Sequence, residues 1–154
     1  MNFNPIIIVS GEPQSVFIEI LLKSLKKLNV NIILISSKDL LKKNIKRFNL
    51  NVKINELKNN YSNFKKKDIN LININYNKFS FTKKKISTES NKFIKLSFNK
   101  ALEIIKKKRC LGLINGPISK TTFLKGKYNG VTEFLAKKTG AKDPVMLIYN
   151  KKLA

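Results

Sequence analysis

The sequence contains no histidine among its 154 residues. Histidine is the side chain that most often serves as a general base near neutral pH, and it is the commonest protein ligand of transition metals. Its absence excludes an imidazole-based metal site or catalytic base on this polypeptide alone. Any chemistry must be carried by Lys, Glu, Asp, Ser, Thr or Tyr side chains, or by another chain.

Cysteine is almost absent, since Cys110 is the only one. A single cysteine cannot form an internal disulfide, and a chain of this length can bury enough apolar surface to fold without one. The lack of a disulfide framework favours a reducing compartment. Because Cys110 directly precedes an apolar segment, we predict a buried and unreactive thiol.

Long apolar runs are also missing. No segment approaches the roughly 20 apolar residues that a membrane-spanning helix requires. The short apolar run Pro5–Val9 has no basic residue ahead of it and is followed at once by a glycine turn, which does not fit a secretory signal. We therefore expect a cytoplasmic protein with no membrane partner.

Acidic residues are scarce, and the formal net charge is +23. Such a charge is compatible with nucleic-acid binding. However, only Arg47 and Arg109 are arginines, and arginine makes most bidentate contacts to bases and phosphates. The lysines are spread along the chain with abundant Asn and Ile, as expected from a preference for A/T-rich codons. This favours solvated surface lysines over a specific nucleic-acid site.

The order of apolar patterns predicts an α/β fold, an open sheet with flanking helices, as a single unit over residues 1–154. Continuous β-branched runs such as Pro5–Val9 are typical of buried parallel strands. They alternate with segments in which apolar residues recur at the spacing of a helix. The predicted strands are 5–9, 31–35, 50–54, 69–76, 111–114 and 144–149, with a further strand at 79–81 left open. The predicted helices are 16–28, 37–48, 87–109 (with Ser87 as N-cap), 119–126 and 132–139.

Three turns that each precede a predicted helix are candidate binding sites. Gly11–Ser15, which contains Glu12, follows a buried strand, and a glycine there permits close backbone approach to a ligand. An ordinary strand-to-helix turn explains it equally well. One glycine is not the three-glycine fingerprint of a dinucleotide site.

The second turn, Asn115–Lys120, also follows a buried strand, and Lys120 could reach an anion held by free helix N–H groups. The alternative is a helix capped by Ser119 with a solvated lysine. In the third, Asn129–Glu133, Thr132 and Glu133 begin a helix, and capping alone would explain both side chains.

Taken together, these stretches resemble the 4-hydroxythreonine-4-phosphate dehydrogenase family of vitamin B6 (pyridoxal phosphate) biosynthesis. The family's turn G-[DE]-P-A-G-I-G-P-E is matched here at Gly11, Glu12, Pro13 and Glu19, while residues 14–18 differ. Its S-A-E-N-G pattern is similar to 87–91, its T-[AG]-P-x-x-K turn to 115–120, and its V-M-M-L strand to 145–148. The closest match is G-H-T-E-F-L-A-x-x-T-G, at 130–140.

The resemblance implies an isocitrate/isopropylmalate-dehydrogenase-like fold of two α/β domains, about twice as long as this chain, which would correspond to its N-terminal half. The family's metal-binding histidines, and its substrate-binding lysine, asparagine and arginine, lie C-terminal to everything aligned. The first of those histidines would come soon after Leu153–Ala154. Val131 occupies the position of a histidine that, with the next threonine, contacts the substrate. Valine can make no hydrogen bond, so only Thr132 is retained.

The implied reaction is oxidation of a secondary alcohol of 4-phosphohydroxythreonine. Hydride passes to NAD or NADP, and the resulting β-keto acid loses carbon dioxide. A divalent metal (Zn, Mg or Co) assists both steps in the family, and dimerisation completes the site. From this we expect Thr132, Lys120 and Glu12 to bind a small phosphorylated substrate, with no catalytic or metal-binding residue assignable on this chain.

Three hypotheses follow. The chain is a dehydrogenase of this family, acting as a homodimer or with a complementing C-terminal half, with little activity alone. Alternatively, it is a catalytically inactive fragment or paralogue that binds a phosphorylated ligand. The least favoured hypothesis is a basic nucleic-acid binder.

Overall fold

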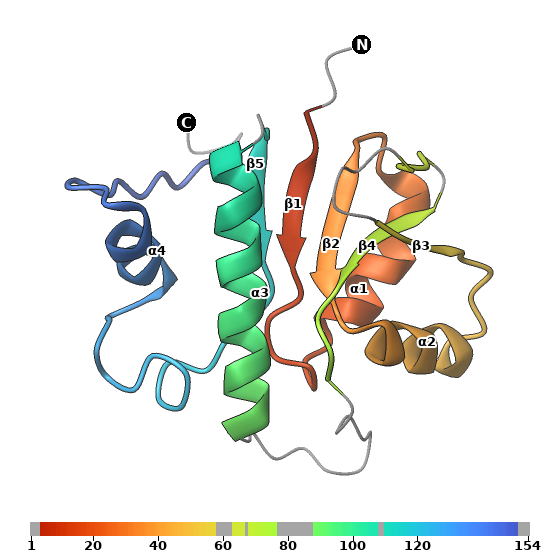
Figure 1. The fold of residues 1–154 in the computed structure, drawn as a ribbon, viewed down its shortest axis with the longest axis horizontal. Helices are drawn as coiled ribbons and strands as arrows, with labels where there is room; N and C mark the ends of the chain where they lie inside the picture. Colours follow the sequence, from red (N-terminus) through yellow and green to blue (C-terminus); the bar gives the residue numbers. More distant parts are fainter. Residues whose placement is uncertain (1–3, 58–62, 67, 77–87, 108–109, 151–154) are drawn as a thin grey trace. The chain divides into compact units, whose positions relative to one another are not determined.

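A computed structural model describes residues 4–57, 63–66, 68–76, 88–107 and 110–150 (Figure 1). The chain groups into two compact units, Met1–Ile118 and Ser119–Ala154. The single α/β unit over residues 1–154 that the sequence predicts stays a prediction. In the described part, no helix is long and apolar enough to cross a membrane.

The first unit is built on a parallel sheet of five strands. The strands are β1 (Ile6–Val9), β2 (Ile32–Ser36), β3 (Ile54–Glu56), β4 (Ile69–Asn73) and β5 (Gly112–Asn115), in the order β3-β4-β2-β1-β5. The register places Ile7 beside both Ile33 of β2 and Leu113 of β5. The central strands are apolar on both faces and buried, as expected for a parallel sheet between helical layers.

Helices cover both faces of this sheet. They are α1 (Phe17–Ser24), extended by the 3₁₀ turn η1 (Leu25–Lys27), α2 (Lys38–Arg47) and α3 (Thr88–Lys107). Figure 1 shows α3 in front of the sheet and α1 behind it; α3 packs against β1 and β2, and α1 packs on α2. The buried residues of α3 recur every three or four positions, which turns one stripe toward the sheet: Ser90, Phe93, Ile94, Ser97, Phe98, Ala101 and Ile104. The open α/β sheet predicted from the sequence is confirmed.

Most predicted elements of this unit are present, but the third strand was placed wrongly. The prediction was 50–54, whereas β3 begins at Ile54. The chain needs residues 49–53 to turn out of α2: Asn49 adopts a left-handed φ of 48°, and the Leu50 amide donates to the Ile45 carbonyl. The strand left open at 79–81 and the N-cap Ser87 lie outside the described residues. Cys110 is half-buried rather than buried.

Among its described residues, 119–150, the second unit has one helix, α4 (Val131–Thr139), which ends as predicted at Gly140 in a left-handed conformation (φ 75°). Its small core is aromatic: the Phe134 ring contacts the rings of Phe123 and Tyr128 edge-on, at centroid distances of 5.5 Å each. The predicted helix 119–126 is wrong, because the segment forms turns. Lys125 and Gly126 both adopt positive φ, at 50° and 68°, which a helix cannot continue through.

The predicted strand 144–149 is also wrong, since the segment has no regular structure and its apolar side chains are exposed. A strand forms only where a neighbouring strand takes up its backbone groups, and among the described residues no strand pairs with this segment.

Candidate functional site

The turns that follow β1 and β5 meet at the carboxyl edge of the sheet. These strands are parallel neighbours, so their ends lie at the same edge. The Gly116 amide donates to the Val9 carbonyl at 2.7 Å, and the Glu12 amide donates to the Pro117 carbonyl at 2.8 Å. Two of the stretches selected from the sequence, Gly11–Ser15 and the start of Asn115–Lys120, are therefore joined backbone to backbone.

The glycines of these turns are required by that contact. A Cβ at Gly11 would lie 2.4 Å from the Pro117 carbonyl oxygen, and one at Gly116 would lie 2.2 Å from the Ser10 carbonyl oxygen. Gly11 also has a φ of +70°, which side chains rarely adopt. At each of these glycines, the backbone of the other turn is the group that approaches closely.

Glu12 is the only predicted site residue in the first unit. Its side chain is buried, with 9% of its surface exposed, and its backbone carbonyl accepts hydrogen bonds from the Ser15 amide (3.0 Å) and hydroxyl (2.8 Å). Nearby in sequence, the Ser10 hydroxyl and the Gln14 Oε1 are buried and make no hydrogen bond within the described part of the chain. This turn therefore carries more buried polar atoms than its own hydrogen bonds satisfy.

The hydroxyl of Ser36 was not singled out from the sequence. It is fully buried at the end of β2 and makes no hydrogen bond to a described residue. Ser10 and Ser36 directly follow Val9 and Ile35, the last residues at which β1 and β2 pair with each other. Ser36 is also paired with Asn73 of β4. The only signal that could have identified them is a serine directly after each of two buried apolar runs.

The N-terminus of α2, also at this edge, is capped by side chains of the chain itself. The Asn73 Oδ1 accepts a hydrogen bond from the Lys38 amide at 2.9 Å, and the Ser37 hydroxyl accepts one from the Leu40 amide at 3.4 Å. The Ser37 hydroxyl also donates to the Tyr76 carbonyl at 3.2 Å. These side chains occupy two amides of the first turn, those of Lys38 and Leu40.

A cavity of about 760 Å³ lies beside the carboxyl end of β4 and against α3. Its lining includes Asn73, Tyr76, Lys92 and Lys100, none of which was selected from the sequence. Lys100 is already paired with Glu103 at 3.0 Å. Hydrogen bonds from Lys107, at 2.9 Å, and from Lys100 lower the pKa of the Glu103 carboxyl below its ordinary value.

The N-terminus of α4, in contrast with that of α2, is open. Its N-cap is Gly130, which has no side chain to accept a hydrogen bond from the first turn. Thr132 is half-buried in that turn. The Glu133 carboxylate folds back toward the same end. Its Oε2 lies 3.1 Å from the position that a Cβ on Gly130 would occupy. Free amides, a hydroxyl and one carboxylate meet at this helix end.

Lys120 lies in the same unit as Thr132, on the turn that packs against α4 through the contact between Phe123 and Phe134. Its side chain is exposed. The Ser119 hydroxyl accepts a hydrogen bond from the Thr122 amide at 3.2 Å, which stabilises this turn without a helix. Lys120 and Thr132 thus sit on two adjoining segments of the second unit, whereas Glu12 belongs to the first unit.

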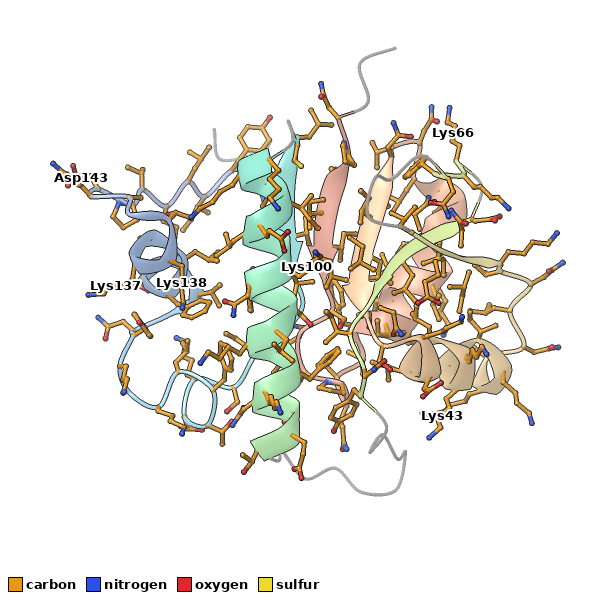
Figure 2. The ribbon with its side chains drawn as sticks, viewed as in Figure 1. Lys43, Lys66, Lys100, Lys137, Lys138 and Asp143 are labelled. Atoms are coloured by element: carbon orange, nitrogen blue, oxygen red, sulfur yellow. The ribbon has the colours of Figure 1, made fainter. Side chains whose placement is uncertain are left out.

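Other lysines of the chain extend from separate elements. Figure 2 shows Lys43 on α2 and Lys66 ahead of β4 at opposite ends of the first unit, and Lys100 on α3. In the second unit, Lys137 and Lys138 belong to the last turn of α4, where positive charge is favoured by the helix dipole. Lys66, Lys137 and Lys138 are exposed, whereas Lys100 is half-buried and paired with Glu103.

The described residues do not fit a divalent metal. Among them, no three His, Cys, Asp or Glu side chains come together in a group that could hold a metal ion.

Comparison with known proteins defines the family. Residues 28–154 match the family described as pyridoxal phosphate biosynthetic protein PdxA. The chain belongs to the PdxA family. A relative from Sulfurihydrogenibium sp. (strain YO3AOP1), named 4-hydroxythreonine-4-phosphate dehydrogenase, is 32% identical over 151 residues. The alignment covers 95% of this chain and 46% of the relative.

Two solved structures share the fold of this PdxA family chain. One is a 4-hydroxythreonine-4-phosphate dehydrogenase from Burkholderia phymatum, with a TM-score of 0.77 and 20% identity over 92% of this chain and 45% of its own. The other, named a putative 4-hydroxythreonine-4-phosphate dehydrogenase, is from Salmonella typhimurium. It has a TM-score of 0.78 and 21% identity over 97% of this chain and 49% of its own. The chain thus spans about half the length of the relatives it matches, and these relatives are dehydrogenases by name.

Proposed function

We propose that this chain supplies the N-terminal half of a 4-hydroxythreonine-4-phosphate dehydrogenase acting in the cytoplasm in pyridoxal phosphate biosynthesis. The reaction would oxidise the secondary alcohol of 4-phosphohydroxythreonine by hydride transfer to NAD or NADP, and the β-keto acid formed would lose carbon dioxide. The observation that carries the proposal is the family match over residues 28–154, which includes the whole of α4 and the turn before it.

In this proposal, the second unit binds the anionic end of the substrate. The amides of the first turn of α4 have no partner within the helix, and the helix dipole favours an anion at that end. The Thr132 hydroxyl would donate a hydrogen bond to the same oxygen atoms, and Lys120 would supply a positive charge from the adjoining turn. Val131, which stands where the family carries a histidine, can contribute only apolar contact. Glu12 is proposed to contact the substrate from the turn after β1.

The chemical step needs groups from outside this chain. Its sequence holds no histidine, and its described residues offer no group of metal ligands. We propose that a complementing C-terminal half, within a dimer, brings the divalent metal (Zn, Mg or Co) and its ligands. The metal would then polarise the substrate oxygen.

The activity test measures NADH or NADPH formation from 4-phosphohydroxythreonine in the presence of Mg²⁺, Zn²⁺ or Co²⁺. The purified chain alone is expected to give no turnover. Turnover is expected after addition of the C-terminal half of the Sulfurihydrogenibium relative. Efficient turnover by the purified chain alone would refute the need for a complementing half, and no turnover by the mixture would refute the proposed reaction.

The binding test compares two lysines of the second unit. Titration calorimetry with 4-phosphohydroxythreonine should show that Lys120→Ala weakens binding about tenfold, as expected from loss of a hydrogen bond to a charged group worth about 1.5 kcal/mol. The matched control Lys127→Ala removes the same charge from an exposed position of the same unit and should leave affinity nearly unchanged. Equal losses in both variants would show that only the net charge matters.

A second candidate function is binding without catalysis, by an inactive fragment or paralogue. The observation that favours it is the combination of an open α4 N-terminus with Val131 in its first turn and no metal ligand group among the described residues. It predicts binding of the phosphorylated substrate without turnover, even when the C-terminal half is present.

A further inference from the structure

A second cavity, of about 420 Å³, lies in the first unit where β2 and β4 begin. It is therefore at the opposite edge of the sheet from the turns that follow β1 and β5. Sites for small ligands usually have a volume of about 300–1,000 Å³, with apolar walls and a few polar groups. This cavity meets both criteria, and the function proposed above makes no use of it.

The walls of the cavity are apolar. Ile32 and Leu34 are two positions apart on β2, so their side chains point to the same face of the sheet. Leucines of α1, of the turn η1 and of the segment that follows cover that face. Leu21 is buried, whereas Leu28 and Val30 are more than 40% exposed, so the cavity is closed at its base and open to solvent at one side. The apolar lining comprises Leu21, Leu25, Leu28, Val30, Ile32 and Leu34.

The rim of the cavity is charged. Lys53 and Lys66, which are exposed, and Asp68, which is half-buried, belong to its lining. Ile54 of β3 pairs with Ile69 of β4, and the Ile69 amide donates to the Lys53 carbonyl at 2.8 Å, so Lys53 and Asp68 are neighbours across the two strands. Figure 2 shows Lys66 just ahead of β4. Two ammonium groups and one carboxylate thus accompany the apolar walls.

A buried asparagine fixes the segment that carries these charges. The Asn70 side chain is 2% exposed, and its Oδ1 accepts hydrogen bonds from the Lys65 amide at 2.9 Å and the Asn55 Nδ2 at 2.8 Å. Its Nδ2 donates to the carbonyls of Lys65 (2.8 Å) and Asp68 (3.2 Å). The backbone on both sides of Lys66 is therefore held in place before a ligand arrives, which lowers the entropy cost of binding.

We propose that this cavity binds a free amino acid with a branched or aromatic side chain. Lys53 and Lys66 would donate hydrogen bonds to the α-carboxylate, Asp68 would accept one from the α-ammonium group, and the leucine walls would take up the side chain. A simple carboxylic acid would bring no cation to Asp68, and a phosphorylated compound would place charge against apolar walls. The inference does not rest on the proposed function, because it concerns binding at the other edge of the sheet.

The test is titration calorimetry of the full chain with L-leucine and L-phenylalanine, for at least one of which we expect a Kd below about 1 mM. Two fragments of leucine separate its charges: 4-methylpentanoate lacks the ammonium group, and 3-methylbutylamine lacks the carboxylate. Each should bind at least about tenfold more weakly than leucine, because it leaves part of the rim without a partner. No binding of either amino acid would overturn the proposal, and so would equal affinities of leucine and 4-methylpentanoate.

Two neighbouring lysines provide a matched pair of variants. Lys66→Ala should weaken leucine binding about tenfold, whereas Lys65→Ala removes the same charge from an exposed side chain that is not part of the lining. Asp68→Asn should weaken the binding of leucine about tenfold but not that of 4-methylpentanoate. Equal losses in the two lysine variants would show that only the net charge matters and would overturn the proposal.

The apolar wall is tested in the same way. Leu28→Ala should weaken leucine binding about tenfold, while Ile20→Ala, at a position of α1 that is 56% exposed and outside the lining, should leave it unchanged. The melting temperatures of both variants should stay close to that of the wild type, because both side chains are partly exposed. Equal losses in both variants would overturn the assignment of the wall.

Two further measurements separate this inference from other possibilities. 4-Phosphohydroxythreonine should not displace leucine, and displacement would overturn the proposal. If the C-terminal half of the Sulfurihydrogenibium relative blocks leucine binding, and Leu28→Ala weakens the association of that half, the occupant is a polypeptide and the proposal fails. Leucine binding without NAD reduction by the mixed halves would refute the proposed function alone, whereas NAD reduction without leucine binding would refute this inference alone.

Discussion

The amide nitrogen of Glu12 donates a 2.8 Å hydrogen bond to the carbonyl oxygen of Pro117. This bond joins the turn after the first strand to the turn after the fifth, at the edge of the sheet where ligands of α/β folds usually bind. The two turns can approach so closely only because Gly11 and Gly116 have no side chains.

Replacing Gly116 by alanine should therefore destabilise the protein. The new Cβ would lie 2.2 Å from the Ser10 carbonyl oxygen, and the backbone must shift to relieve the overlap. We expect Gly116→Ala to lower the free energy of unfolding by about 1–3 kcal/mol in urea denaturation. Gly112→Ala, in the same strand segment, meets nothing within 4 Å and is the control, with little change expected. Equal effects in the two variants would contradict this account of the turns.

Ser37 joins the start of α2 to the chain after β4, through its hydrogen bonds with the Leu40 amide and the Tyr76 carbonyl. We expect Ser37→Ala to lower the free energy of unfolding by about 1–2 kcal/mol, the usual value for loss of an N-cap. Ser24→Ala removes a hydroxyl that bonds only back to the Ile20 carbonyl at 2.7 Å, and it should change stability by less than about 0.5 kcal/mol. A similar loss in both serine variants would show that capping is not the cause.

The ion pairs of Glu103 with Lys100 and Lys107 should make a pH-dependent contribution to stability. Its hydrogen bonds with Lys107 and Lys100 lower the pKa of the folded-state carboxyl, so the stabilisation is fully present above the unfolded-state pKa, about 4.5. It is lost as the pH falls through the lowered folded-state pKa. We expect Glu103→Gln to melt at a lower temperature than the wild type at neutral pH, and the difference to disappear in acid. A difference that persists unchanged at low pH would contradict this cause.

Glu133 should oppose anion binding at α4. Its carboxylate folds back toward the N-terminus of the helix, where it already compensates the helix dipole. We expect Glu133→Gln to raise the affinity for inorganic phosphate about two- to fivefold, as measured by calorimetry. Asp143→Asn makes the same charge change outside the helix, and it should have little effect. If both variants raise the affinity equally, the net charge and not the helix end is responsible.

The candidate site was only partly predictable from the sequence. The selection of Glu12, Lys120 and Thr132 rested on turns that follow buried strands or begin helices, and the structure places Lys120 and Thr132 on segments joined by the rings of Phe123 and Phe134. The contact between the turns at Gly11 and Gly116 could not be predicted, because it depends on β1 and β5 being neighbours in the sheet. The buried hydroxyls of Ser10 and Ser36 were missed for the same reason.

The sequence by itself determined the apolar strands, the helices with regular spacing and their order, because burial on both faces or on one stripe leaves a local periodic pattern. It did not determine which predicted elements find a partner. Residues 144–149 have the pattern of a buried strand but no described strand beside them. Residues 119–126 form turns, with Lys125 and Gly126 at positive φ, although a helix was predicted there. Strand pairing and packing involve residues distant in sequence, so only the tertiary structure decided them.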